Sequence, residues 1–173
     1  MYRWKRAHGV HKGRAMNFWI RQVLRCGMIV GLVYLPSCSE KPPKVVFVEG
    51  KRNLENAYLQ GADLNGMDFS NANFSGASLR NANLRGTNLQ DAVLVKTDFQ
   101  EADLRGANAR GADASYANFY RANLQNVDFQ GATISRANFR ESNVRGANFQ
   151  DVIGLDQGVR EFLQSNGAVI GGS

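Results

Sequence analysis

Residues 57–76 read AYLQG ADLNG MDFSN ANFSG, and the same five-residue pattern continues without insertion from Arg52 to Asp151. These twenty units place Leu at the central position nine times and Phe seven times, with one Ile, one Val, Ala109 and Ala114 in the others. The residue two positions before the centre is Ala in fourteen units. A period of five matches neither the 3.6-residue repeat of a helix nor the alternation of a long strand. The chain is therefore expected to turn once in every unit.

The order of residue types within a unit predicts a closed coil. A small and a large apolar residue separated by one polar residue point to the same side of a short extended segment. Asn, Asp and Gly favour a corner between such segments. Four sides close a coil, and one coil alone cannot bury its large side chains, so coils must stack at the inter-strand spacing of about 4.8 Å.

Over residues 52–151 the units resemble the pentapeptide repeat family, whose motif is A(D/N)LXX. The resemblance implies an all-β fold, a right-handed quadrilateral β-solenoid. Twenty units at four per coil give about five coils. We expect a short C-terminal capping helix, because an open end would expose apolar core and unpaired backbone.

With four sides, the central residues of units twenty positions apart are expected to stack in columns. Phe99, Phe119 and Phe139 should form the rigid spine of the core. We expect neighbouring Phe rings to fill the space beside Ala109 and Ala114, with a ligand pocket as the alternative. The predicted columns are Leu54, Phe74, Leu94, Ala114 and Ile134; Leu59, Leu79, Phe99, Phe119 and Phe139; Leu64, Leu84, Leu104, Leu124 and Val144; and Phe69, Leu89, Ala109, Phe129 and Phe149.

The positive charge of the chain is concentrated in a leader. Residues 1–37 hold seven Lys or Arg and no acid, whereas residues 38–173 hold fourteen bases and fifteen acids, a net of −1. A basic segment precedes ten apolar residues, 26–35, in the order of a signal peptide. The sequence LPSC at 35–38 then resembles the lipobox of bacterial lipoproteins, although Pro36 departs from its pattern. Cys38 is the predicted lipidation site; a secretion signal, an uncleaved anchor and a chance apolar segment are the alternatives.

These features divide the chain into four parts. Residues 1–37 are the signal peptide or leader, with Met16 as an alternative start, and 38–51 hold the lipid-attachment Cys, a linker and an N-terminal cap. The cap is the β-prone run 44–48. Residues 52–151 form the repeat solenoid, and 152–173 form the C-terminal cap.

The C-terminal cap is predicted to contain a helix. Asp156 is a suitable N-cap, the Asn166-Gly167 pair is a suitable end, and Val159, Phe162 and Leu163 share one helical face. We expect the helix to fold its apolar face over the last coil. A homodimer interface made from the same residues and Val169-Ile170 is the alternative.

The residue types of the repeat domain disfavour an enzyme. After Cys38 the chain contains no His, Trp or Cys. Histidine supplies most general acid and base catalysis near neutral pH and many metal ligands, and a Ser or Cys nucleophile usually needs a His partner. We predict no catalytic residues, no cofactor and no metal site. Turn chemistry explains the acids that recur at the polar position before the centre, with acid catalysis or calcium binding as the alternatives. These are Asp63, Asp68, Asp98, Asp103, Asp113 and Asp128.

Two outward-facing features are candidate partner surfaces. The unit at 92–96 places Val93 and Val95 where polar residues are expected, and Tyr116 and Tyr120 in the next coil could extend this apolar patch. Two neighbouring faces also carry a mild basic stripe, for which ion pairs with local acids are the alternative explanation. The stripe consists of Arg80, Arg85, Arg105, Arg140 and Arg145.

The favoured function is an exported, lipid-anchored scaffold on the periplasmic side of a bacterial membrane. Its partner would be a protein or an envelope polymer bound through a solenoid face, with no nucleic acid. The family resemblance implies an alternative, since some members mimic duplex DNA and modulate type II topoisomerase. Mimicry of this kind needs a strongly acidic rod, which a net charge of −1 does not supply.

Overall fold

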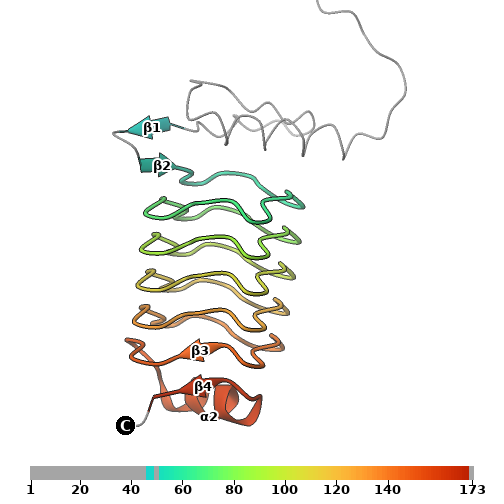
Figure 1. The fold of residues 1–173 in the computed structure, drawn as a ribbon, viewed down its shortest axis with the longest axis vertical. Coiled ribbons are helices and arrows are strands. Elements are labelled where there is room, and N and C mark those ends of the chain that lie inside the picture. The colour runs from blue at the N-terminus through green and yellow to red at the C-terminus, as the bar shows by residue number, and fades with distance from the viewer. Residues whose placement is uncertain (1–45, 49–50, 172–173) are drawn as a thin grey trace, which may run out of the picture.

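The computed structural model describes residues 46–48 and 51–171, with side chains from Asn53 onward. This part of the chain is a stack of coils along one axis, with β1 at one end and α2 at the other (Figure 1). The regular elements are strands β1 (Val46–Val48), β2 (Lys51–Asn53), β3 (Asn148–Phe149) and β4 (Val169–Ile170), and helix α2 (Gln157–Ser165).

Backbone hydrogen bonds between successive coils hold the stack together. Parallel bridges pair residues twenty positions apart, such as Tyr58 with Ser78, and they recur every five residues. The N–H of Leu59 donates to the Ser78 carbonyl at 2.8 Å, and the N–H of Ser78 donates to the Ala57 carbonyl at 2.8 Å. Four units therefore make one turn of the solenoid. We call its sides face 1, face 2, face 3 and face 4, which contain Leu94, Phe99, Leu104 and Ala109 in the third rung.

Each unit ends in a tight turn, which we number by the face it follows, from corner 1 to corner 4. In the first unit the N–H of Ala57 donates to the carbonyl of Leu54 at 3.0 Å, and Asn56 at the third position of the turn has φ 55°. The polar residue before the centre also stabilises the turn, because Asn53 Oδ1 accepts from the N–H of Glu55 at 3.1 Å. Side-chain acceptors of this kind are typical of Asn and Asp in turns.

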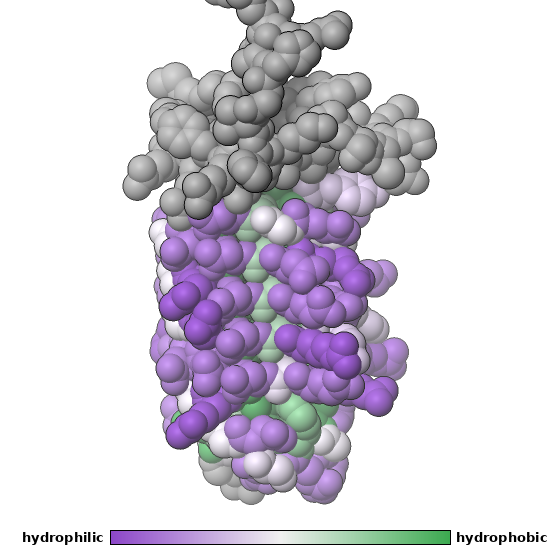
Figure 2. Space-filling view, turned by 90° about the vertical axis from the view of Figure 1, so that its right-hand side faces the viewer, coloured by the Kyte–Doolittle hydropathy of each residue, from purple (hydrophilic) through white to green (hydrophobic). Residues whose placement is uncertain are grey.

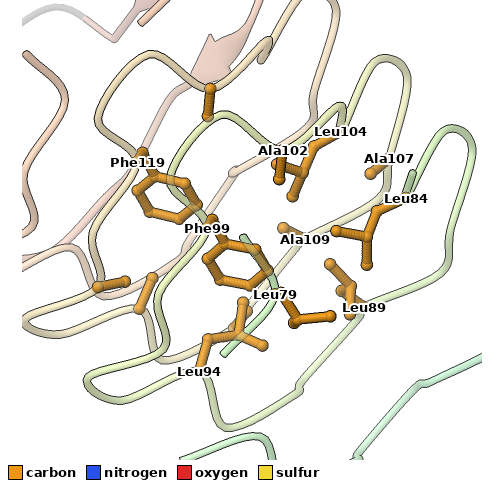
Figure 3. Packing of buried hydrophobic residues seen from close by; sticks show 14 of the residues in the cluster. Leu79, Leu84, Leu89, Leu94, Phe99, Ala102, Leu104, Ala107, Ala109 and Phe119 are labelled. Carbon is orange, nitrogen blue, oxygen red and sulfur yellow. The ribbon is translucent and has the colours of Figure 1, made fainter. Parts of the chain in front are cut away.

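The interior is filled by large central side chains and small residues beside them. The rings of Phe99 and Phe119 stack with centroids 5.1 Å apart and planes 3° apart, and Phe119 and Phe139 stack at 5.1 Å and 10°. Figure 3 shows the Phe99 ring beside Ala109 inside the coil, and both Ala109 and Ala114 are fully buried. The Leu column of face 3 is at most 1% exposed at Leu64, Leu84, Leu104 and Leu124.

Three units carry a hydroxyl at the position two before the centre, which is Ala or another apolar residue in sixteen of the twenty units. Each hydroxyl donates to a backbone carbonyl: Thr87 Oγ1 to Leu84 at 2.7 Å, Thr97 Oγ1 to Phe74 at 2.8 Å, and Ser142 Oγ to Phe139 at 2.7 Å. Burying a hydroxyl without such a partner would cost free energy. Across the described residues, every buried polar side-chain atom has a hydrogen-bond partner.

Short strands lie at the N-terminal end of the stack. β1 pairs antiparallel with β2, with Val46 opposite Asn53. β2 then leads directly into the first coil (Figure 1). Residues 44 and 45, the start of the β-prone run, lie outside the described part of the chain.

The C-terminal end extends the backbone ladder once before α2 and once after it. Ile153 forms a bridge with Thr133, so the face 1 ladder continues past the last repeat. Helix α2 then begins at Asp156, whose Oδ1 accepts from the N–H of Val159 at 2.8 Å, and it buries Leu163 completely. After the helix, β4 pairs in parallel with β3. The residues expected to form a cap therefore also extend the backbone ladder.

Candidate interaction surface

The apolar patch proposed from the sequence lies on face 1 and at corner 1. Val93 is 38% exposed and Tyr116 in the next rung is 49% exposed, whereas Val95 is half-buried. The backbone of Val93 bridges Asn73 and Asp113, so its side chain replaces a turn-forming Asn or Asp in the middle of the ladder. Val93 and Tyr116 thus expose apolar surface on adjacent rungs.

A cation lies on the ring of Tyr116, the tyrosine at corner 1. The guanidinium of Arg136 lies 5.6 Å from the centre of the Tyr116 ring. Tyr116 and Arg136 are twenty positions apart and occupy the same corner in successive rungs, so their side chains meet across the stack. Cation–π contacts at exposed sites contribute about 0.5–1 kcal/mol.

Tyr120 makes its contacts at the following corner instead of at the apolar patch. Its hydroxyl donates to Glu141 Oε1 at 3.0 Å, and Arg121 Nε donates to Glu141 Oε2 at 2.7 Å. The hydrogen bond from Arg121, followed by the one from Tyr120, holds the pKa of Glu141 below its ordinary value. The Arg121 guanidinium also lies 5.0 Å from the Tyr120 ring centre. These three side chains form one exposed cluster at corner 2.

The structure divides the predicted basic stripe into paired and unpaired cations. Arg80 pairs with Asp98 at 3.3 Å, and Arg105 pairs with Asp103 at 2.6 Å. The hydrogen bond from Arg105 lowers the pKa of Asp103. Local ion pairing therefore accounts for these two arginines. Among the described residues, Arg85, Arg140 and Arg145 form no ion pair.

Three further apolar residues are exposed, and only Val169 among them was named from the sequence, as part of the alternative dimer interface. Ile153 is 61% exposed, and Tyr58 and Val169 are also exposed. Their positions in the repeat could have indicated exposure. Tyr58 occupies the polar position before a centre, and Ile153 occupies the same position one coil after Thr133. All three lie in the first or last rungs, away from the patch at Val93.

The surface on one side of the solenoid is mainly polar. Figure 2 shows rows of polar side chains on either side of a narrow apolar stripe that runs parallel to the axis, with further apolar side chains at the C-terminal end. Within residues 53–171 no three His, Cys, Asp or Glu side chains are grouped to hold a metal ion. The arrangement offers contact surface and hydrogen-bonding groups, which are the properties of a binding module.

Comparison with known proteins identifies the repeat. The sequence profile described as pentapeptide repeats matches residues 53–91, 87–126 and 117–153, with eight copies. The chain belongs to the pentapeptide repeat family. Its fold is accordingly the right-handed β-helical solenoid of this family, and the family resemblance drawn from residues 52–151 is confirmed.

Solved structures of other family members are similar to this chain. HetL of Nostoc sp. strain PCC 7120, a protein involved in heterocyst differentiation regulation, is 34% identical over 55% of this chain and 48% of its own, with a TM-score of 0.47. A protein of the Arabidopsis thaliana thylakoid lumen is 35% identical over 65% of this chain and 81% of its own, with a TM-score of 0.34. The chain thus spans about half the length of HetL. No curated protein sequence matches the chain.

A plasmid-mediated fluoroquinolone resistance protein, QnrB1, is also similar in fold. It is 18% identical over 70% of this chain and 82% of its own, with a TM-score of 0.31.

The predicted lipidation site Cys38 and the leader lie outside the described residues. Among residues 46–48 and 51–171, no helix has the length and apolar character needed to cross a membrane.

Proposed function

We propose that this protein is a non-enzymatic scaffold that binds another protein through the side of the solenoid that carries Val93 and Tyr116. In this proposal the scaffold is a four-sided solenoid of five coils, and α2 caps its C-terminal end. A lipid on Cys38 tethers it to the periplasmic side of a bacterial membrane.

The observation that carries the binding function is the exposure of Val93 and Tyr116 on adjacent rungs. The interior is filled with Leu, Phe and Ala, so a ligand has to be bound on the outside. Exposed aromatic and apolar side chains with cations beside them are typical of the energetically important centres of protein interfaces. The corresponding positions on face 4 and its corner carry Asn, Asp and Gly, which are ordinary turn residues.

The charge of the solenoid does not favour the DNA-mimic alternative. Residues 53–171 hold ten Arg or Lys and thirteen Asp or Glu, and the two signs are interspersed along the rod. A mimic of duplex DNA would need a continuous row of unpaired acids. Here Asp98, Asp103 and Asp128 are each paired with an arginine.

Site-specific photo-cross-linking in the native cell tests the binding function. A benzophenone side chain at position 116 should form an adduct with another protein, whereas the same group at Gln130 on face 4 should not. Absence of adducts at every outward position tested would overturn the scaffold function.

Membrane fractionation tests the tether separately. Wild type should incorporate labelled palmitate and sediment with membranes, and Cys38→Ala should lose both properties, because stable attachment needs at least two acyl chains. Wild type that carries no label and remains soluble would overturn the lipid anchor without affecting the binding function.

A further inference from the structure

The third residue of every corner turn adopts the left-handed conformation, with φ between 55° and 70° in all twenty units. This conformation suits Gly, and after it Asn and Asp, because other side chains crowd the backbone there. Fourteen of the twenty corners follow this rule. The remaining six carry long or bulky side chains: Lys96, Glu101, Tyr116, Arg121, Arg136 and Glu141.

These six exceptions are not scattered over the solenoid. They occupy the third to fifth rungs of corner 1 and corner 2, the two corners that border face 2. Corners 3 and 4 carry only Gly, Asn or Asp in every rung. Residues for which the left-handed conformation is unfavourable therefore occur repeatedly at two adjacent corners and nowhere else in the repeat. Strained positions of this kind cluster at functional sites.

The two edges differ in how their charges are satisfied. At corner 2, Glu141 accepts hydrogen bonds from Arg121 and Tyr120. Glu101 accepts from Gln100 Nε2 at 3.2 Å. Corner 2 is therefore internally paired.

Corner 1 instead presents cations that form no ion pair within the described part of the chain. Within residues 53–171, neither Lys96 nor Arg136 forms an ion pair, and the Arg136 guanidinium lies on the Tyr116 ring. Val93 and Val95 lie in the rung that contains Lys96. An exposed edge with two unpaired cations, one aromatic ring and adjoining apolar surface is complementary to acidic and apolar side chains.

We propose that corner 1, made of Lys96, Tyr116 and Arg136 together with Val93 and Val95, binds an acidic segment of a partner polypeptide in extended conformation. This inference rests on the proposed scaffold function and names its partner chemistry. The two cations are two rungs apart, about 9.6 Å along the axis at roughly 4.8 Å per rung. An extended segment covers that distance in about three residues. Partner carboxylates two residues apart point to the same side of an extended segment, so both would reach the cations through the flexible side chains of Lys96 and Arg136.

The surroundings of corner 1 favour a polypeptide over a polyanion such as nucleic acid. Asp98, Glu101 and Asp113 lie on the adjoining sides of rungs three and four, so this edge suits a few spaced carboxylates and disfavours a continuous row of phosphates. The exposed Val93 and half-buried Val95 would gain nothing from a phosphate backbone, whereas they could be covered by apolar side chains of a peptide.

Fluorescence anisotropy with the full chain purified in detergent tests this inference. The probe is a fluorescein-labelled decapeptide of alternating Glu and Val. The test variant is Lys96→Asn/Tyr116→Asn/Arg136→Asn, which installs the residue that other corners already use. The control variant is Arg110→Gln/Arg160→Gln, which also removes two positive charges, one from face 4 and one from α2. A circular dichroism melt of each variant establishes that it is folded.

We expect the probe to bind wild type, with affinity reduced by about tenfold in the triple variant and by less than about twofold in the control. Equal losses in the two variants, or equal binding of the decapeptide with Lys in place of Glu, would overturn the inference. So would tighter binding of a DNA decanucleotide or of phosphatidylglycerol in the micelles. If photo-cross-links in cells form from other faces but not from position 116, this inference fails together with the choice of binding side, while a scaffold function through another side stands.

Discussion

Corners 1 and 2 of the solenoid differ from corners 3 and 4, although all four have the same backbone conformation. From the third rung onward corners 1 and 2 carry Lys, Glu, Tyr and Arg, whereas corners 3 and 4 carry only Gly, Asn and Asp. The interiors of the four faces are alike, because each stacks large and small apolar residues. The demands of the fold therefore do not explain the difference between the corners.

The comparison separates two kinds of constraint within one five-residue unit. The central residue and the residue two before it are determined by packing, and their substitution creates a cavity or a clash. The corner residue projects into solvent, so its side chain is free to vary at the cost of some backbone strain. A solenoid can thus change its binding surface at the corners without changing its core.

The largest expected effect concerns the packed interior, which is expected to constrain all four faces in the same way. Phe119→Ala should destabilise the protein by roughly 3–5 kcal/mol, because the ring stacks between Phe99 and Phe139 in a column that cannot collapse. A denaturant melt measures this change. A loss below about 1 kcal/mol would show that the interior tolerates a cavity, and the core would then not be the shared constraint.

The interior could be predicted from the sequence because its signal is periodic and its spacing has one geometric solution. With four sides, Phe99, Phe119 and Phe139 must share a column, and the structure has them stacked. The corner asymmetry was not predicted from the sequence, where turn chemistry was ascribed to Asn, Asp and Gly in general and to the acids at the polar position before the centre. The left-handed φ lies three positions later, at residues such as Tyr116.

The pairing of surface charges could be predicted only in part from the sequence. Arg80 and Asp98 are eighteen positions apart and meet only because the coils stack, whereas Arg105 and Asp103 lie in one unit. Arg85 has the same place in its unit as Arg105, but the polar residue before its centre is Asn83, so it has no acid in its own unit. For pairs that form between coils, such as Arg80 with Asp98, only the three-dimensional structure distinguishes paired from unpaired cations.

The next prediction introduces a long side chain, of the kind found at corners 1 and 2, at corner 3. Gly106 at corner 3 has φ 65°, and a Cβ there would meet no atom within 4 Å. Gly106→Lys should therefore destabilise through backbone strain alone, by roughly 1–2 kcal/mol. Thermal denaturation followed by circular dichroism measures it. Gly106→Asn is the matched control and should cost less, since Asn tolerates this conformation. Equal stability of all three proteins would mean that the corners carry no strain.

The reverse substitution should have the opposite sign and a smaller size. Lys96 has φ 55° and forms no ion pair within the described residues. Lys96→Asn should stabilise the protein by roughly 0.5–1 kcal/mol, because it relieves strain and removes no ion pair. The same melts measure it. A loss of stability would indicate that Lys96 is kept for the fold, and the functional explanation of corner 1 would be weakened.

The smallest expected effect concerns the internally paired charges of corner 2. The hydrogen bonds from Arg121 and then Tyr120 lower the pKa of Glu141 in the folded protein. A lowered pKa stabilises the folded state at pH values above the ordinary Glu pKa, and this contribution disappears as the pH falls through the folded-state value. Wild type should therefore exceed Glu141→Gln in stability at neutral pH by a small margin, and the margin should vanish on acidification.

Parallel melts of wild type and Glu141→Gln between neutral and strongly acidic pH would measure this margin. It should shrink in high salt, because the cluster is exposed and salt screens it. The Arg121→Gln background is the control: there Glu141→Gln should lose most of its pH-dependent effect, since the first cause of the pKa shift is gone. A margin that persists in that background, or that grows on acidification, would show that Glu141 is not stabilised by its pairing. Corner 2 would then resemble corner 1, with charges left for a partner, and the distinction between the two edges of face 2 would no longer hold.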